Sequence, residues 1–101
     1  MAVTSKLLFR GAATTTTTTT LYTTPAATTA VVTNIVVTNT SSSARTFTLS
    51  LGGTSIHTAS ALAANSTAYI DLKQVLNATQ TIQGGASATD VTFHISGAEI
   101  V

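Results

Sequence analysis

The chain has 101 residues, the size of one small domain, and only 7% of them are charged, which gives a net charge of +1. Positive and negative residues are nearly equal in number, which excludes the clustered lysine and arginine surface that nucleic-acid binding requires. The chain contains no cysteine, which excludes a disulfide framework.

The surface is predicted to serve mainly for contacts with other protein copies. Mean hydropathy is +0.40 and only 7% of the residues are charged, whereas soluble surfaces usually carry about 25% charged residues. We therefore expect the chain to associate with itself as a dimer or trimer. No apolar stretch approaches the roughly 20 residues of a membrane span. The apolar run after Lys6 is three residues long, too short for a signal peptide, so we expect folding in the cytoplasm and no membrane partner.

Residues 1–20 are predicted to form an N-terminal arm or the first strands, ahead of a sandwich domain over residues 21–101. Within them, Ser5–Gly11 has the composition of a short strand or a docking arm. Thr14–Thr20 is an unbroken run of threonine, whose β-branching favours extended backbone. Identical residues on both faces specify no register, so the run is predicted as a strand positioned by its neighbours, with a flexible linker as the alternative. Pro25 removes a backbone donor and predicts a turn.

Thr29–Thr40 is the strongest predicted strand. Both of its faces are at least half apolar, which is typical of a strand that is covered on both sides. One predicted face contains Val31, Thr33, Ile35 and Val37, and the other contains Val32, Asn34, Val36 and Thr38.

The next predicted strand, Arg45–Leu51, alternates cleanly between apolar and polar residues. Its inward residues are predicted to be Phe47, Leu49 and Leu51. Gly52-Gly53 then predicts a tight hairpin that leads into a strand over Thr54–Ser60.

The last third of the chain predicts three more strands. Ser66–Leu72 is a strand, Leu72–Asn77 has the spacing of a single helical turn, and Gln80–Gln83 is a short strand. Alternation resumes at Val91 and is predicted to slip by one at Gly97, the signature of a β-bulge. The residues predicted to point inward are Ala68, Ile70 and Leu72, then Val91, Phe93 and Ile95, then Ala98 and Ile100.

Seven or eight short strands at roughly 8–12-residue spacing are typical of a β-sandwich. No predicted helix is long enough to cover a sheet, so one sheet must pack on another. The predicted fold is therefore all-β. Among sandwiches we favour a jelly roll, with an extended Thr-rich N-terminal arm.

The sequence offers no catalytic, cofactor-binding or metal site. His57 and His94 are the candidate bases or soft-metal ligands, but they lie on separate strands with no third ligand beside them. Ser87 follows a glycine pair, yet no histidine stands at a spacing suited to a nucleophilic triad. Asp71 and Lys73 share one strand face and are predicted to be a surface or interface charge pair rather than a catalytic dyad. We therefore predict that the protein is not an enzyme.

Two segments resemble a group of small virion structural proteins of tailed bacteriophages. They are LYTTPAATTAVVTNIVVTNTSSSARTFTLSLGG and ANSTAYIDLKQVLNATQTIQGGASATDVTFHISGAEIV, which together reach from Leu21 to Val101. Members of the group share the patterns LYT-P-A-T-A-V--I-V-NT---ARTFTL, L--VLNA--TI-G-AS and V-(Y/F)-ISG-E. The resemblance includes no catalytic motif, and the Thr14–Thr20 run is outside the shared pattern.

The resemblance implies a β-sandwich subunit carried on the virion, on the head surface or near the tail. The first interpretation is a capsid decoration (cement) protein that binds the outside of the assembled head and stabilises it, with the major capsid protein or other virion proteins as partners. The second is a tail- or baseplate-associated structural or host-binding module. The third is a carbohydrate-binding domain, which is disfavoured because sugar-binding faces display aromatic platforms and this chain has no tryptophan and two tyrosines.

Residues 1–20 are expected to reach onto an adjacent subunit or the capsid, and the sandwich is expected to form homo-oligomers. The predicted interface residues are Leu7, Phe9, Arg10, Val32, Val36 and Tyr69. Copy number separates the first two interpretations, because a decoration protein approaches the count of the major shell protein and a tail component does not.

Overall fold

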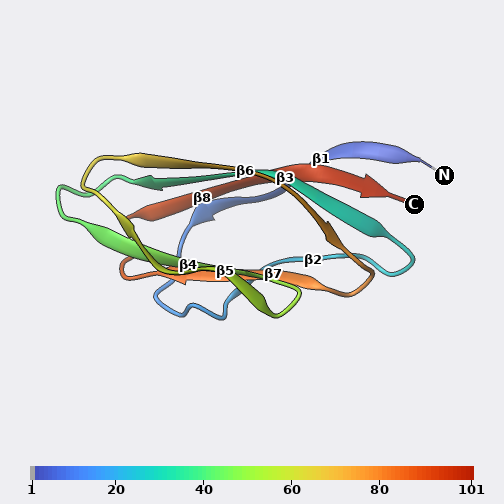
Figure 1. Ribbon diagram of the computed structural model, residues 1–101, viewed down its shortest axis with the longest axis horizontal. Helices are drawn as coiled ribbons and strands as arrows, with labels where there is room; N and C mark the ends of the chain where they lie inside the picture. Colours follow the sequence, from blue (N-terminus) through green and yellow to red (C-terminus); the bar gives the residue numbers. More distant parts are fainter. Residues whose placement is uncertain (1) are drawn as a thin grey trace.

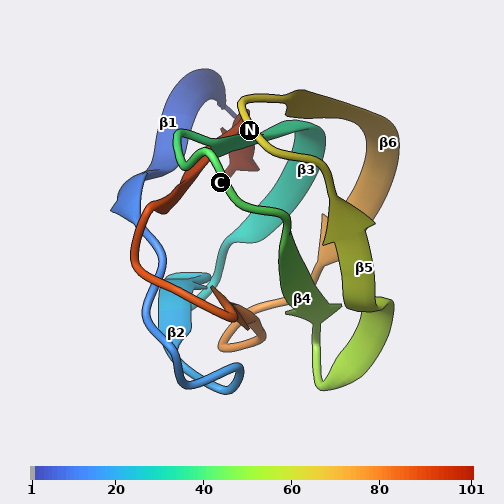
Figure 2. The same ribbon diagram turned by 90° about the vertical axis from the view of Figure 1, so that its left-hand side faces the viewer.

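Eight antiparallel strands form two sheets that pack face to face in the computed structural model, which describes residues 2–101 (Figures 1 and 2). Sheet A has the strand order β1-β8-β3-β6, and sheet B has the order β2-β7-β4-β5. The strands are β1 (Val3–Ala12), β2 (Thr20–Thr23), β3 (Thr29–Asn39), β4 (Arg45–Leu51), β5 (Thr54–Leu62), β6 (Thr67–Leu76), β7 (Thr81–Ala86) and β8 (Val91–Ile100). The predicted all-β sandwich is confirmed. The part of the chain that the structure describes contains no helix long and apolar enough to cross a membrane.

The Gly52-Gly53 turn joins β4 to β5 within sheet B, as the sequence predicts. Both glycines have positive φ, 58° and 84°, as a two-residue hairpin that follows the strand twist requires. Every other connection carries the chain from one sheet to the other (Figure 2). The first and last strands pair with each other, and reciprocal backbone bonds between Ala2 and Val101 bring the two ends of the described chain together (Figure 1).

The core lies between the sheets and is built from the inward positions of alternating strands. Phe47, Leu49 and Leu51 are buried as predicted, and they face Ile35 and Phe93 of sheet A in one continuous apolar cluster. The predicted inward residues of β6 pack against this cluster while remaining half-buried. They are Ala68, Ile70 and Leu72.

Sheet A contains a line of β-bulges that decides which residues point inward. Relative to β8, β1 has one extra residue at Leu8 and β3 has one at Thr33, and β6 has a further extra residue opposite Thr33. Val32 and Ile35, three positions apart, are therefore both fully buried, whereas Val31 points outward. The predicted division of β3 into two alternating faces is wrong, because it assumed an unbroken alternation.

The last strand, β8, keeps its alternation through Gly97, contrary to the predicted slip. Its outward residues beyond this point are Ala98 and Ile100. Glu99 points inward, where it accepts a hydrogen bond from Tyr22 of sheet B. The extra residues stand in the neighbouring strands β1 and β3, so the sequence of β8 alone does not reveal them.

The threonine run is a loop rather than a strand, so the prediction for Thr14–Thr20 is wrong except at Thr20, where β2 begins. The hydroxyls of Thr14 and Thr19 each donate to the carbonyl oxygen of Thr16 at 3.0 Å, and they lie 2.6 Å from each other. Such local bonds compete with a strand ladder. Two backbone carbonyl oxygens of the loop also accept hydrogen bonds from backbone amides of β7, at 2.9 and 3.0 Å. A flexible linker would not be held in this way.

The N-terminal arm predicted over residues 1–20 is not confirmed. Val3–Ala12 forms β1, an edge strand of sheet A that pairs with β8, and Met1 lies outside the described residues. The helical turn predicted over Leu72–Asn77 is wrong, because β6 continues through Leu76 and pairs with β3. Pairing with a neighbouring strand outweighs a helical spacing that is only one turn long.

Candidate interaction surface

The outer face of sheet A presents apolar and charged side chains in rows that cross all four strands. Paired residues of neighbouring antiparallel strands project to the same side of a sheet, so the strand register defines these rows. From β1 to β6, one row is Arg10, His94, Val36 and Tyr69. The next two rows are Leu7, Ser96, Asn34 and Asp71, and then Ser5, Ala98, Val31 and Val75.

Most of the large apolar side chains that are exposed within residues 2–101 lie on this face. Tyr69 is 75% exposed, Val3 66%, Val75 58% and Leu7 47%. On sheet B, the exposed apolar residue is Ile56 of β5, at 37%. Val3 and Leu7 lie on the edge strand β1, and Tyr69 and Val75 lie on the opposite edge strand β6. Large apolar side chains gathered on one face favour an interaction site there.

The outer face of sheet B has a different character, because hydroxyl and amide side chains cover it. These side chains are Thr46, Thr48 and Ser50 of β4, Ser55 of β5 and Gln83 of β7. The threonine loop lies over the backbone of β7 at Gly85. Such a face is well hydrated, so the two sides of the sandwich suit different surroundings.

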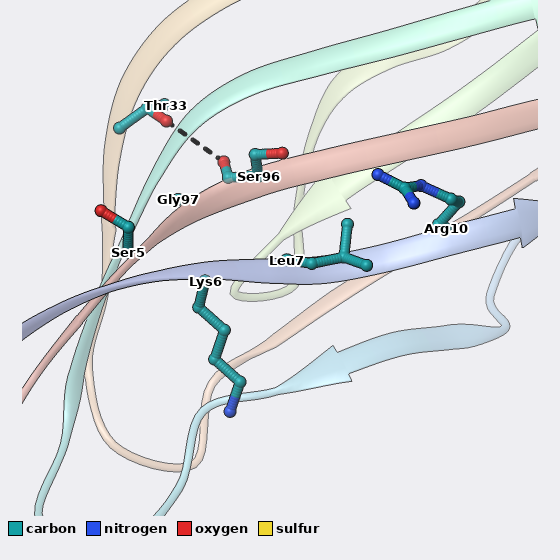
Figure 3. A pocket seen from close by; sticks show the side chains of 7 residues that line it. All are labelled: Ser5, Lys6, Leu7, Arg10, Thr33, Ser96 and Gly97. Carbon is teal, nitrogen blue, oxygen red and sulfur yellow. Dashed lines mark hydrogen bonds between the residues drawn. The ribbon is translucent and has the colours of Figure 1, made fainter.

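Two shallow hollows interrupt the outer face of sheet A along the line of bulges. Each has a volume of about 440 Å³, and Thr33 contributes to both. The first is lined by Thr33, Asp71, Leu72 and Lys73. The second lies over β1, β8 and β3 beside Leu7 and Arg10 (Figure 3). Thr33 Oγ1 donates to the carbonyl oxygen of Ser96 at 3.3 Å, a bond that holds the β3 bulge against β8.

Lys6 lines the second hollow, but its side chain points to the other side of sheet A, toward β2 (Figure 3). Its Nζ lies 3.2 Å from Glu99 Oε1, and the Tyr22 hydroxyl donates to the same carboxylate. This bond from Tyr22 lowers the pKa of Glu99, while burial, together with Glu99, raises the pKa of Tyr22. The cluster joins the two sheets. The charged side chains of the outer face are then Arg10, Asp71 and Lys73.

The structure places the predicted interface residues in two different environments. Those that it brings together on the outer face of sheet A are Leu7, Arg10, Val36 and Tyr69. Phe9 is half-buried and packs against the core. Val32 is fully buried, so its prediction as an interface residue is wrong. The bulge at Thr33 is the physical reason, because it places Val32 on the core side.

Sequence reasoning missed Val75, because the spacing of Leu72–Asn77 imitates a helical turn. The signal that could have found it is the alternation of β6 itself. Its outward positions recur every second residue, at Tyr69, Asp71, Lys73 and Val75.

The histidine and serine side chains considered above as candidate catalytic groups lie apart in the structure. Within residues 2–101, no three His, Cys, Asp or Glu side chains gather as a metal site would require. His57 Nδ1 lies 3.0 Å from the Ser60 hydroxyl on β5, whereas His94 lies on the outer face of sheet A. Ser87 Oγ accepts a bond from the Thr46 amide at 3.1 Å, as a turn residue does.

No protein-family model matches this chain, and no curated protein matches it. The candidate site is the outer face of sheet A.

Proposed function

We propose that this chain is a jelly-roll structural protein of a tailed-bacteriophage virion and that it decorates the outside of the assembled head. The observation that carries the proposal is the strand order, β1-β8-β3-β6 in one sheet and β2-β7-β4-β5 in the other. A jelly roll places eight strands in two sheets through two Greek keys, and this architecture recurs in viral capsid proteins and in lectins.

The sequence pattern supports the same class of protein. Residues 21–101 resemble small virion proteins in an ordered series of strand and turn residues. In the structure, these residues supply seven complete or nearly complete strands, from β2 to β8. A net charge of +1 with only 7% charged residues also favours association with neighbouring subunits.

The two outer faces support a subunit that is held on one side and hydrated on the other. The outer face of sheet A exposes Tyr69, Val75 and Leu7, which would be covered by protein in an assembly. The outer face of sheet B carries hydroxyl groups and would face water. The major capsid protein or another virion protein is the partner of the assembled subunit, and either that partner or a second copy of the chain would cover the outer face of sheet A.

A tail- or baseplate-associated structural module would use the same fold and the same faces. Copy number separates this alternative from decoration of the head. A carbohydrate-binding role receives less support, because Tyr22 lies in the core and Tyr69 is left as the exposed tyrosine.

The test is the stoichiometry of this chain in purified virus particles, measured by quantitative mass spectrometry against the major capsid protein. A known tail protein in the same sample provides the reference for a low copy number. Decoration of the head predicts a copy number equal to that of the major capsid protein or a simple fraction of it. A count like that of the tail reference would assign the chain to the tail, and absence from the particle would overturn the virion proposal.

A further inference from the structure

We propose that two copies of this chain associate through the outer faces of their A sheets, about a twofold axis that runs parallel to the strands. The inference does not rest on the proposed function, because it concerns the purified chain alone. Three features of the face support it: the placement of its charged and aromatic groups, its area, and the state of the sheet edges.

The two edge strands of sheet A carry complementary groups at the same level. Arg10 on β1 lies in the same row as Tyr69 on β6, and Asp71 follows Tyr69 on the same side, about 7 Å further along the strand. A twofold axis parallel to the strands places β1 of one copy over β6 of the other and keeps each row at its level. Arg10 then faces Tyr69 of the second copy, and its long side chain can reach Asp71 in the neighbouring row, opposite Leu7. The same contacts form at the opposite edge, as a symmetric interface requires.

The hollow beside Leu7 and Arg10 fits this arrangement. In the twofold pair, Tyr69 of the second copy stands over β1, where the hollow of about 440 Å³ opens on the same face (Figure 3). Figure 3 shows Leu7 and Arg10 pointing to the outer side, where they would contact an inserted ring. A buried aromatic ring in such a position is the usual anchor of an interface.

The area of the face is sufficient for a specific dimer. Four strands at about 4.8 Å spacing and roughly 33 Å length give about 600 Å² of sheet in each copy. Two copies would bury about 1,200 Å², the lower end of the range for stable interfaces.

The edges of the sheets favour association through the face rather than through a new strand pair. β1 and β6 are both bulged, and β6 carries Asp71 and Lys73 at its bulge. In sheet B, β2 has only four residues and β5 pairs with two register shifts. Bulges, charges and short lengths are the devices that prevent edge pairing.

The first test is the mass of the purified chain over a concentration series, by light scattering and sedimentation. We expect a dimer, with twice the 10.2 kDa of one chain, that dissociates on dilution. Tyr69→Ser and Arg10→Asp should each raise the dissociation constant at least about tenfold. Arg10→Asp combined with Asp71→Arg should recover part of this loss. Ile56→Ser removes an exposed apolar side chain from sheet B and is the matched control, with no effect on association.

The second test concerns the symmetry and uses the absence of native cysteine. Ala12 and Thr67 end one row at opposite edges of sheet A, about 14 Å apart across the sheet. The twofold axis brings Ala12 of one copy over Thr67 of the other. A mixture of Ala12→Cys and Thr67→Cys chains should therefore cross-link with a short bismaleimide, and neither variant alone should.

Thermal unfolding of each variant shows whether its sandwich is intact. Replacement of an exposed side chain such as Tyr69 should leave the unfolding midpoint unchanged. The proposal is overturned by a monomer at every concentration or by a trimer. It is also overturned if Ile56→Ser weakens association as much as Tyr69→Ser, or if Ala12→Cys cross-links to itself. A monomer whose attachment to virus shells depends on Tyr69 would assign the face to the shell protein instead.

Discussion

Thr79 adopts a backbone conformation that β-branched residues rarely tolerate. Its φ is 71°, in the left-handed region, where the Cβ crowds the following carbonyl. The turn keeps this conformation because the amide of Thr79 donates to the carbonyl oxygen of Thr24 at 3.0 Å, and the amide of Gln80 donates to that of Asn77 at 3.0 Å. The strain is therefore imposed by the way this turn docks against the end of β2.

Thr79→Gly should raise the free energy of unfolding by about 1 kcal/mol, because glycine adopts positive φ without the Cβ clash and both backbone bonds remain. Urea unfolding at neutral pH measures the change. Ala78→Gly is the matched control, since Ala78 has no positive φ and glycine there should be neutral or destabilising. A lower stability for Thr79→Gly than for the parent chain would show that the turn is not strained at this residue.

At the scale of single strands, Gly97 is required where β3 and β8 approach each other closely. An added Cβ would collide with the carbonyl oxygen of Val31, which is backbone and cannot turn aside. Gly97→Ala should therefore lower the free energy of unfolding by about 1–3 kcal/mol. Gly11→Ala is the control in the same sheet, because its Cβ would lie no closer than 3.4 Å to the ring of Phe9. Equal stability of the two variants in urea would contradict the close approach at Gly97.

The threonine loop should detach from β7 when Gly85 gains a side chain. A Cβ at this position would collide with the carbonyl oxygen of Thr16 and approach that of Thr14 to 2.9 Å. The amides of Gly84 and Ala86 donate to loop carbonyls at 3.0 and 2.9 Å, so their hydrogen exchange reports on the contact.

In the Gly85→Ala variant, these two amides should exchange faster while the amides of β3 stay protected. The comparison within one sample serves as its own control. Unchanged exchange at Gly84 and Ala86 would mean that the loop yields without leaving β7. Equal loss of protection in β3 would mean that the whole sandwich had been destabilised.

At the scale of the whole molecule, two carboxylates connect elements that are far apart in the chain. Arg45 donates to both oxygens of Asp90 at 3.0 Å, and Tyr22 and Lys6 both bond Glu99. The bonds from Arg45 lower the pKa of Asp90, and the bond from Tyr22 lowers the pKa of Glu99.

A lowered pKa in the folded state makes stability depend on pH in a defined direction. Both carboxylates bind protons more readily in the unfolded chain, whose carboxyl pKa is about 4. Their stabilisation is therefore complete above that pH and is lost as the pH falls through the lower folded values. Thermal unfolding from pH 7 to pH 2 should show a falling midpoint. The combined Asp90→Asn and Glu99→Gln variant should show a flatter curve, and an equally steep fall in that variant would assign the effect to other groups.

The sequence predicts the strands of this fold well where residues alternate and where a turn has a distinctive composition. Arg45–Leu51 and the Gly52-Gly53 hairpin are examples, because period-two alternation and paired positive φ are local properties. The buried sides of β3 and β8 beyond Gly97 could not be predicted. They depend on extra residues at Leu8 and Thr33, and an extra residue exists only relative to the strand beside it.

The candidate surface was predictable only in part, for the same reason. Leu7, Arg10, Val36 and Tyr69 are distant in the chain, and the register of three strand pairs brings them onto one face. Val32 and Val36 are the same type of residue, but the bulge at Thr33 lies between them and places Val32 on the core side. The hydrogen bonds from threonine hydroxyls within the run likewise depend on the shape of the loop that connects β1 of sheet A to β2 of sheet B.

The reciprocal backbone hydrogen bonds between Ala2 and Val101 hold the two ends of the described chain side by side. Circular permutation succeeds where termini are close and the new opening lies in an exposed turn. The exposed Gly52-Gly53 hairpin is such a turn, so a permuted chain opened there would retain all eight strands in both sheets. A peptide joined at either end of the described chain would also emerge from the same end of the sandwich, while the permuted ends would emerge from the tip of sheet B.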